Sequence, residues 1–363
     1  MSRRSYLDWL RGVAVLIMIE AHTFDSWTRF DARGHSLYGP LTVLAGFGAP
    51  LFLFLAGVAL ALATGSRQRK GQPDAEVASL ARRRGWQIFG LAFLFRLQSW
   101  LISGGPFSSL LKVDILNVMG LSMLLGAVLW GWGRSRLSRG LWLVAAAVAF
   151  TMVTPLVRET GIFSPIPDRL EAYFRPVAGR TTFSMFPWAG FLFVGGAIGL
   201  WLDRARTAAE ERRVNIALGL AGAAIGFAGY AASFLPPIYA QSSFWTSSPT
   251  FFFLRVGILM LTLPAAYAWN AMWQGRVRRS AEREGGSPLQ DFGRASLFVY
   301  WVHVEMVYGV VSVGIHKQLS FGGAVAAFAT FTLFLFLVAK AKDRLVGIVS
   351  RAPARRPAAP AER

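Results

Sequence analysis

Three ionisable side chains in the first apolar segment have residue types and a spacing suited to proton transfer. The segment reads SYLDWLRGVAVLIMIEAHTFDSW and contains Asp8, Arg11 and His22. On a helix, Arg11 and His22 lie about three turns and about 16 Å apart on one face, with Asp8 beside them. Asp8 and Arg11 can form an ion pair, and an imidazole exchanges protons near neutral pH. This stripe predicts an anion-binding end and a deeper general base, or else polar groups that only bond neighbouring helices.

Two further groups of polar side chains are candidates for the same site. Ser296, Tyr300 and His303 share one helical face, and His303 is either a second catalytic residue or a side chain bonded to neighbouring helices. Asp114 and Asn117 are three residues apart at the start of another apolar segment. This spacing predicts either a substrate contact or a helix cap.

Arg96 and Arg255 lie deep inside apolar segments, where an unpaired guanidinium is costly. They predict contacts to an anionic ligand such as a phosphate, or ion pairs with Glu20, Glu305 or Asp114. The sequence contains no Walker motif, GxSxG, HExxH or carboxylate cluster with metal-ligand spacing, so we expect no metal site.

The composition excludes a soluble globular domain. Of the 363 residues, 54% are hydrophobic and only 16% are charged, whereas soluble chains carry about 25% charged residues. The excess apolar surface must therefore face lipid. The absence of Cys excludes disulfide frameworks, thiolate zinc sites and Cys nucleophiles.

The apolar pattern predicts an all-α, polytopic integral membrane bundle of about ten transmembrane helices. We expect one transmembrane domain over residues 1–345 and a disordered basic, Pro- and Ala-rich tail over 346–363. Each span needs about 20 mostly apolar residues. The expected spans are 6–24, 41–64, 85–103, 113–132, 140–157, 182–202, 214–235, 250–271, 295–314 and 321–339.

The distribution of Lys and Arg predicts the orientation. Of the 38 basic residues, 27 lie in the termini and in alternate loops, and eight lie on the opposite side. Because cytoplasmic loops are enriched in Lys and Arg, both termini are expected in the cytoplasm, in a bacterial-type inner (plasma) membrane. The same asymmetry explains the net charge of +19 without nucleic-acid binding.

Several sequence blocks resemble a known group of membrane enzymes. SYLDWLRGVAVLIMIEAH resembles the N-terminal motif of the transmembrane acyltransferase superfamily, whose acyltransferase-3 members have an Arg and a His spaced as Arg11 and His22 are here. The chain is more similar to the heparan-alpha-glucosaminide N-acetyltransferase catalytic-domain family. This resemblance runs in order through LDWLRG, GAPLFLFLAGVAL, DILNVMG, SMFPWAGFLFVGGAIG and GRASLFVYWVH.

The resemblance implies a bundle that binds acetyl-CoA from the cytoplasmic face and transfers the acyl group to a sugar or glycan amine or hydroxyl at the opposite face. It favours His22 as the general base, with Asp8 and Arg11 orienting the donor. Arg11, Arg96 and Arg255 become candidates for coenzyme binding. His35 is the second candidate base, because the family's eukaryotic enzymes have Asn in place of His22 and a catalytic His in the first outer loop.

Two other functions remain open from the residues. A transporter or flippase of a glycan or lipid-linked intermediate could use the same stripe to relay protons or bind an anionic head group. A non-catalytic membrane scaffold would only need the charges to pair. A glycine-rich face on the sixth expected span would permit oligomerisation.

Overall fold

The computed structural model describes residues 4–279 and 287–351, and the described chain is helical with no named β-strand. Four short helices are α2 (Tyr38–Ala45), α7 (Asp168–Phe174), α11 (Pro288–Arg294) and α12 (Ser296–Tyr308). The long helices are α1 (Ser5–Trp27), α3 (Gly48–Arg69), α4 (Asp74–Ser103), α5 (Ile115–Trp132), α6 (Arg136–Glu159), α8 (Met185–Leu202), α9 (Ala208–Ala232), α10 (Pro249–Arg279) and α13 (Phe321–Arg351).

The predicted all-α membrane bundle is confirmed. Seven segments of the described chain are long and apolar enough to cross a membrane. Helices α1 and α4 have comparable lengths, 23 and 30 residues, and they carry the ionisable side chains of the first and third expected spans. The seven segments together with α1, α4 and α12 agree with the expected number of about ten transmembrane helices. The protein is therefore an integral, multi-pass membrane protein.

Several expected spans have different limits in the structure. The helix of the third, α4, begins 11 residues before the expected limit, at Asp74. The second span is divided into α2 and α3 by a break at Gly46 and Phe47. The ninth ends at Tyr308, because the next residue, Gly309, has an extended backbone. Helix α13 continues to Arg351, and the rest of the expected tail, 352–363, lies outside the described residues.

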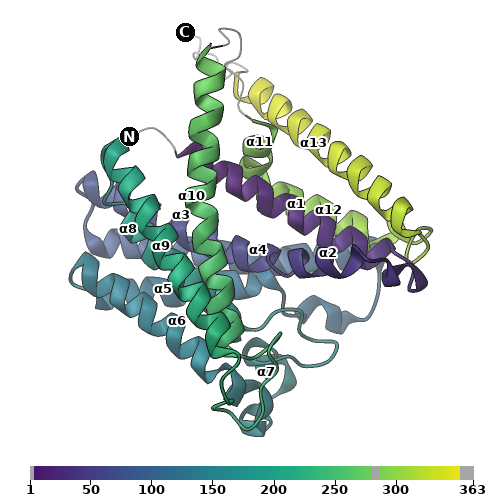
Figure 1. Ribbon diagram of the computed structural model, residues 1–363. Coiled ribbons are helices and arrows are strands. Elements are labelled where there is room, and N and C mark those ends of the chain that lie inside the picture. The colour runs from purple at the N-terminus through teal and green to yellow at the C-terminus, as the bar shows by residue number, and fades with distance from the viewer. Residues whose placement is uncertain (1–3, 280–286, 352–363) are drawn as a thin grey trace, which may run out of the picture.

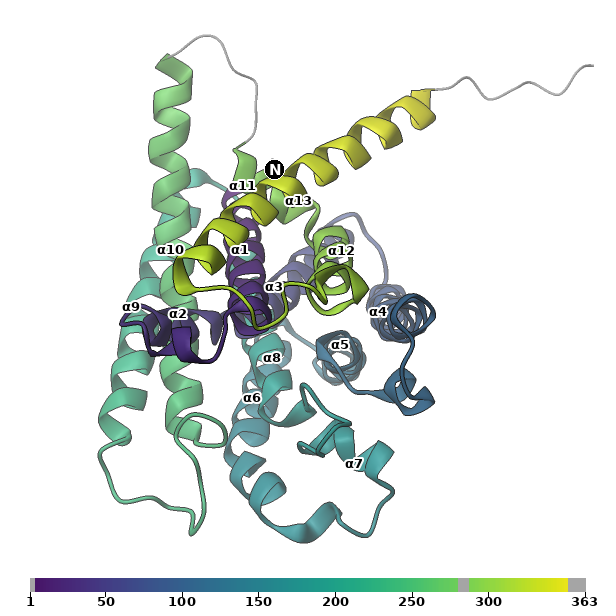
Figure 2. The same ribbon diagram turned by 90° about the vertical axis from the view of Figure 1, so that its right-hand side faces the viewer.

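The connections between helices gather at two opposite ends of the bundle. The connections after α3, α5 and α8 lie toward the upper left of Figure 1, and α7 lies at the bottom. We call the first of these the basic end, because its connections and adjoining helix turns carry Arg67, Arg83, Arg136 and Arg206. Figure 2 shows α13 crossing α1 and α11 before its last turns extend away from the bundle.

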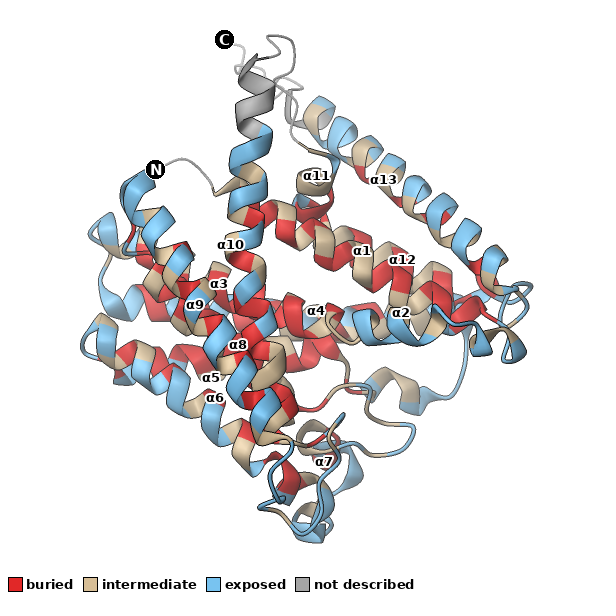
Figure 3. Ribbon diagram, viewed as in Figure 1, coloured by how far each residue is buried: buried red, intermediate tan, exposed pale blue. Residues whose placement is uncertain are grey.

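Burial follows the facing sides of the helices, and the outer sides are exposed (Figure 3). The exposed positions of α9 and α13 include Phe227 and Leu337, which are large apolar side chains suited to lipid. Helix α8 instead packs closely inside the bundle. A Cβ at Gly195 would lie 1.9 Å from the carbonyl oxygen of Phe54 on α3, so this glycine permits the close approach of the two backbones. Because this part of the glycine-rich segment contacts α3, it is not an exposed surface for a second copy.

A buried carboxylate joins the helices at the basic end. Asp203, directly after α8, has a side chain only 1% exposed. It pairs with Arg69 of α3 at 2.5 Å and with Arg136 of α6 at 3.0 Å. Near it, Asp74 at the start of α4 accepts hydrogen bonds from Gln68 and Arg139, and these bonds lower the pKa of Asp74.

Asp203→Ala is expected to lower the stability of the folded chain by about 1.5 to 3 kcal/mol, because it removes a charge-assisted hydrogen bond from Asp203 to arginines that are themselves about a third exposed. The measurement is the thermal unfolding midpoint in detergent. The control is Asp343→Ala, since Asp343 pairs with Lys342 on an exposed part of α13, and exposed pairs contribute little. Equal midpoints for the two variants would show that the Asp203 pairs do not hold the basic end together.

Candidate active site

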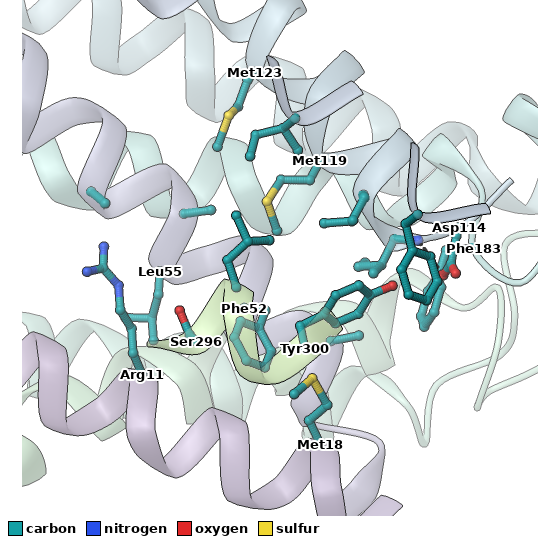
Figure 4. Close-up of a pocket in the computed structure, with 18 of the residues that line it drawn as sticks. Arg11, Met18, Phe52, Leu55, Asp114, Met119, Met123, Phe183, Ser296 and Tyr300 are labelled. Carbon is teal, nitrogen blue, oxygen red and sulfur yellow. Dashed lines mark hydrogen bonds between the residues drawn. The ribbon is translucent and has the colours of Figure 1, made fainter. Parts of the chain in front are cut away.

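A cavity of about 1230 Å³ passes through the bundle between α1, α3, α4, α5 and α12. Figure 4 shows part of its lining, with Arg11 on one side and Asp114 on the other. Concave sites of this kind, mostly apolar with a few convergent polar groups, are where proteins bind small molecules. The cavity is therefore the candidate binding site, and several of the predicted site residues line it.

The mouth of the cavity at the basic end is lined by arginines. Arg67 comes from α3, Arg83 and Arg84 from the first turns of α4, Arg294 from the end of α11, and Arg11 from α1. Four of them are exposed, and Arg11 is half-buried. Guanidinium groups bind phosphates by charge-assisted, bidentate hydrogen bonds, so this mouth suits a polyanionic ligand.

Four of these arginines, Arg67, Arg83, Arg84 and Arg294, could not be recognised as site residues from the sequence, where they contribute only to the charge asymmetry. A signal was present, however, because six of the cavity-lining residues of α3 follow helical spacing: Ala49, Phe52, Ala56, Ala59, Ala63 and Arg67. After Phe52, this face carries only alanines until it reaches Arg67.

The middle of the cavity is apolar. Met18 of α1, Phe52 and Leu55 of α3, and Met119 and Met123 of α5 face one another across it (Figure 4). An apolar section excludes water from a reacting group, and its flexible Met side chains can adapt to a ligand.

His22 lines the cavity farther from the basic end and hydrogen-bonds a second histidine. Its Nδ1 lies 2.8 Å from Nε2 of His303 on α12, and the two ring planes are parallel to within 3°, with centroids 5.0 Å apart. His303 is fully buried, and its Nδ1 lies 2.9 Å from the carbonyl oxygen of Val299. The structure therefore brings together two histidines 281 residues apart, and only His22 is in the cavity lining.

The two histidines meet because α11 crosses α1 at very short range. A Cβ at Gly12 would lie 1.9 Å from the carbonyl oxygen of Leu289, and one at Gly293 would lie 1.8 Å from that of Asp8. Only glycine permits such an approach. This crossing sets where α12 begins, and Ser26 of α1 then donates a hydrogen bond to the carbonyl of Val307, 3.0 Å away.

Asp114 has one of the two roles that the sequence left open, that of a helix cap. Its Oδ1 accepts a hydrogen bond from the backbone N–H of Ile115 at 2.6 Å, and its own N–H donates to Oδ1 of Asn117 at 2.9 Å, which is a capping box for α5. Its Oδ2 also pairs with Arg96 at 2.6 Å. Asp114 nevertheless lines the cavity, and the hydroxyl of Tyr300 points toward it (Figure 4).

The other expected site residues divide into two groups. Arg11, which lines the cavity, pairs with buried Asp8 at 3.2 Å, and Arg96 lines the end far from the basic mouth. His35 and Arg255 are outside the cavity lining. His35 is exposed and stacks on Phe321, and the Arg255 guanidinium lies 3.9 Å from the ring centroid of Phe251. Asn117 is buried behind the cap of α5.

The chain matches one family model, that of the heparan-alpha-glucosaminide N-acetyltransferase catalytic domain, over residues 3–230. It belongs to this family. Comparison with curated proteins found no match. The matched region includes Arg11, His22, the arginines of α3 and α4, and Asp114, whereas α12 with His303 lies beyond it. As a member of the heparan-alpha-glucosaminide N-acetyltransferase catalytic family, the chain is a membrane acetyltransferase.

Proposed function

We propose that this acetyltransferase uses acetyl-CoA as its donor and a sugar or glycan amine or hydroxyl as its acceptor, with His22 as the general base. The observation that carries the proposal is that His22 lines the same cavity as the arginine mouth. One end of the cavity suits a polyphosphate, and the other holds a side chain able to remove a proton. Membership of the heparan-alpha-glucosaminide family supports a glycan acceptor.

The length of the cavity supports a donor shaped like acetyl-CoA. Arg84 and Arg96 both line it, and they are 12 residues apart on α4, or about 18 Å along the helix axis. In our proposal the coenzyme phosphates bind Arg67, Arg83 and Arg84, and the pantetheine arm lies in the apolar middle. The thioester then reaches the level of His22. Arg11, held by Asp8, orients the donor partway along this path.

The proposed reaction is direct acyl transfer in one chamber. The acceptor nitrogen or oxygen attacks the thioester carbonyl while its proton moves to Nε2 of His22. The carbon–sulfur bond breaks, the acyl group stays on the acceptor, and the proton on Nε2 passes to the departing thiolate. We propose that the acceptor binds near Asp114, Lys112 and Trp188, which line the end of the cavity remote from the basic mouth.

We propose that the basic end is cytoplasmic, because Lys and Arg are enriched on the cytoplasmic side of membrane proteins. Acetyl-CoA then enters from the cytoplasm, and the acceptor is reached from the opposite face of a bacterial-type plasma membrane. A cavity lined from the basic end to Lys112 is also compatible with the second candidate, a glycan or lipid-linked intermediate transporter.

Calorimetry of the purified wild-type chain in detergent with acetyl-CoA is expected to show micromolar binding, and addition of glucosamine is expected to yield N-acetylglucosamine and CoA. The same preparation in proteoliposomes, with labelled glucosamine and no acetyl donor, tests transport. Absence of acetyl-CoA binding by a folded chain would overturn the acetyl-CoA proposal. Uptake of unmodified sugar together with no binding would establish the transporter instead.

A further inference from the structure

We propose that His303 is a positioning residue, which holds His22 in the tautomer that can act as a base. This inference rests on the proposed function and goes beyond it, because His303 acts through His22 and does not contact the substrate. Its basis is a chain of two hydrogen bonds, from His22 Nδ1 to His303 Nε2 at 2.8 Å and from His303 Nδ1 to the carbonyl of Val299 at 2.9 Å.

The direction of both hydrogen bonds follows from the last acceptor. The carbonyl oxygen of Val299 can only accept, so the proton in that bond belongs to Nδ1 of His303. A second proton on Nε2 would make His303 a cation. The ring is 0% exposed, and among the described residues no carboxylate hydrogen-bonds it, so such a charge would be buried without a partner. Nε2 of His303 is therefore an acceptor.

The proton between the two rings then belongs to His22. With Nδ1 of His22 protonated and donating to His303, the neutral ring carries its lone pair on Nε2. That nitrogen has no hydrogen bond to the described part of the chain, and the side chain lines the cavity. A free imidazole side chain prefers the opposite tautomer, with the proton on Nε2, which could not remove a proton from the acceptor at that atom. The hydrogen bond to His303 thus selects the reactive form.

The same hydrogen bond is kept when His22 becomes positively charged during the reaction. When Nε2 of His22 takes the acceptor's proton, the ring becomes an imidazolium whose Nδ1–H is already hydrogen-bonded to Nε2 of His303. The partner is neutral, so the ring is held in orientation without a buried carboxylate. The proton then leaves Nε2 for the thiolate, and both histidines return to their starting tautomers.

Two substitutions test the proposal; both introduce a side-chain amide, but the two side chains differ in length. In His303→Gln the amide oxygen can occupy the position of Nε2 and accept from His22, whereas in His303→Asn the amide lies nearer the backbone and cannot reach it. We expect kcat to fall by about 10²-fold in His303→Asn and by less than about tenfold in His303→Gln, with the KM for acetyl-CoA unchanged in both. Wild-type kcat in His303→Asn would overturn the inference.

A spectroscopic test does not depend on the folding of a variant. The chain has four histidines, so ¹⁵N-histidine labelling of the intact protein gives four ring spin systems. Substitution of exposed His316 by Gln removes one of them for assignment; because its Nδ1 lies 3.1 Å from Oγ of Ser26, the activity of this variant is measured alongside the spectrum. We expect both His22 and His303 to be protonated on Nδ1 and unprotonated on Nε2. A wild-type His22 protonated on Nε2 would overturn the inference whatever the variants do.

The outcomes also separate this inference from the proposed function. If His22→Ala is inactive while His303→Asn retains wild-type kcat, His22 is the base and His303 has no positioning role. If His22→Ala retains activity, the assignment of the base is wrong and the positioning inference fails with it.

Discussion

His22→Ala is expected to lower kcat for acetyl transfer by about 10³-fold while binding acetyl-CoA as tightly as the wild-type chain. The imidazole is the group in the cavity lining that can exchange a proton near neutral pH, and it is remote from the arginine mouth that we propose for the phosphates. Removing it should therefore affect the chemical step and leave donor binding intact. Single-turnover transfer to glucosamine measures the first quantity, and calorimetry measures the second.

His35→Ala is the matched control for this prediction. His35 is the other candidate base, but its side chain is exposed, stacks on Phe321 and is outside the cavity lining. We expect this variant to turn over at a rate close to that of the wild type. A collapse of kcat in His35→Ala together with an active His22→Ala would transfer the role of base to His35, and would require the 31–37 segment to move into the cavity.

The double variant Arg83→Ala/Arg84→Ala is expected to raise the KM for acetyl-CoA by about 10²-fold or more, with kcat little changed. Each charge-assisted hydrogen bond to a phosphate contributes about 1.5 to 3 kcal/mol, and about 1.4 kcal/mol corresponds to a factor of ten. Both arginines line the mouth, and the ion pairs found among the described residues of α3, α4 and α6 involve other arginines: Arg69, Arg96, Arg136 and Arg139. Removal of Arg83 and Arg84 should weaken binding of the donor in the ground state and the transition state alike.

A truncated donor distinguishes phosphate binding from a general effect on the fold. Acetyl-pantetheine carries the same thioester without the nucleotide and its phosphates, so its KM should be the same for the double variant and the wild type. Arg82→Ala is the control variant, since Arg82 is exposed on the same turn of α4 but outside the cavity lining. An equal loss of activity with both donors would show that Arg83 and Arg84 support the structure and do not bind phosphate.

The stripe on the first helix could be predicted because helical geometry is local. A spacing of 11 residues places Arg11 and His22 on one face whatever the rest of the chain does, and the structure has both lining one cavity. The same argument grouped Ser296, Tyr300 and His303, but it could not say that Ser296 and Tyr300 line the cavity while His303 lies behind His22.

The partners of the intramembrane charges could not be predicted in this way. The sequence offered Glu20, Glu305 and Asp114 as partners for Arg96, and helix packing selected Asp114. Likewise Arg83 and Arg84 could not be chosen from 38 basic residues until the small side chains of α3 were seen to open the cavity toward them. Arg255, equally deep in its helix, is outside the cavity lining and packs on Phe251.

Composition, span length and residue spacing were sufficient for an all-α membrane bundle and for one face carrying Arg11 and His22. These properties depend on the solvent around each segment and on the periodicity of a single helix. The pairing of His22 with His303 depended on tertiary structure. It requires α11 to cross α1 at the contact of Gly12 with Leu289, and such a contact between distant backbones is determined by the packing of the whole bundle.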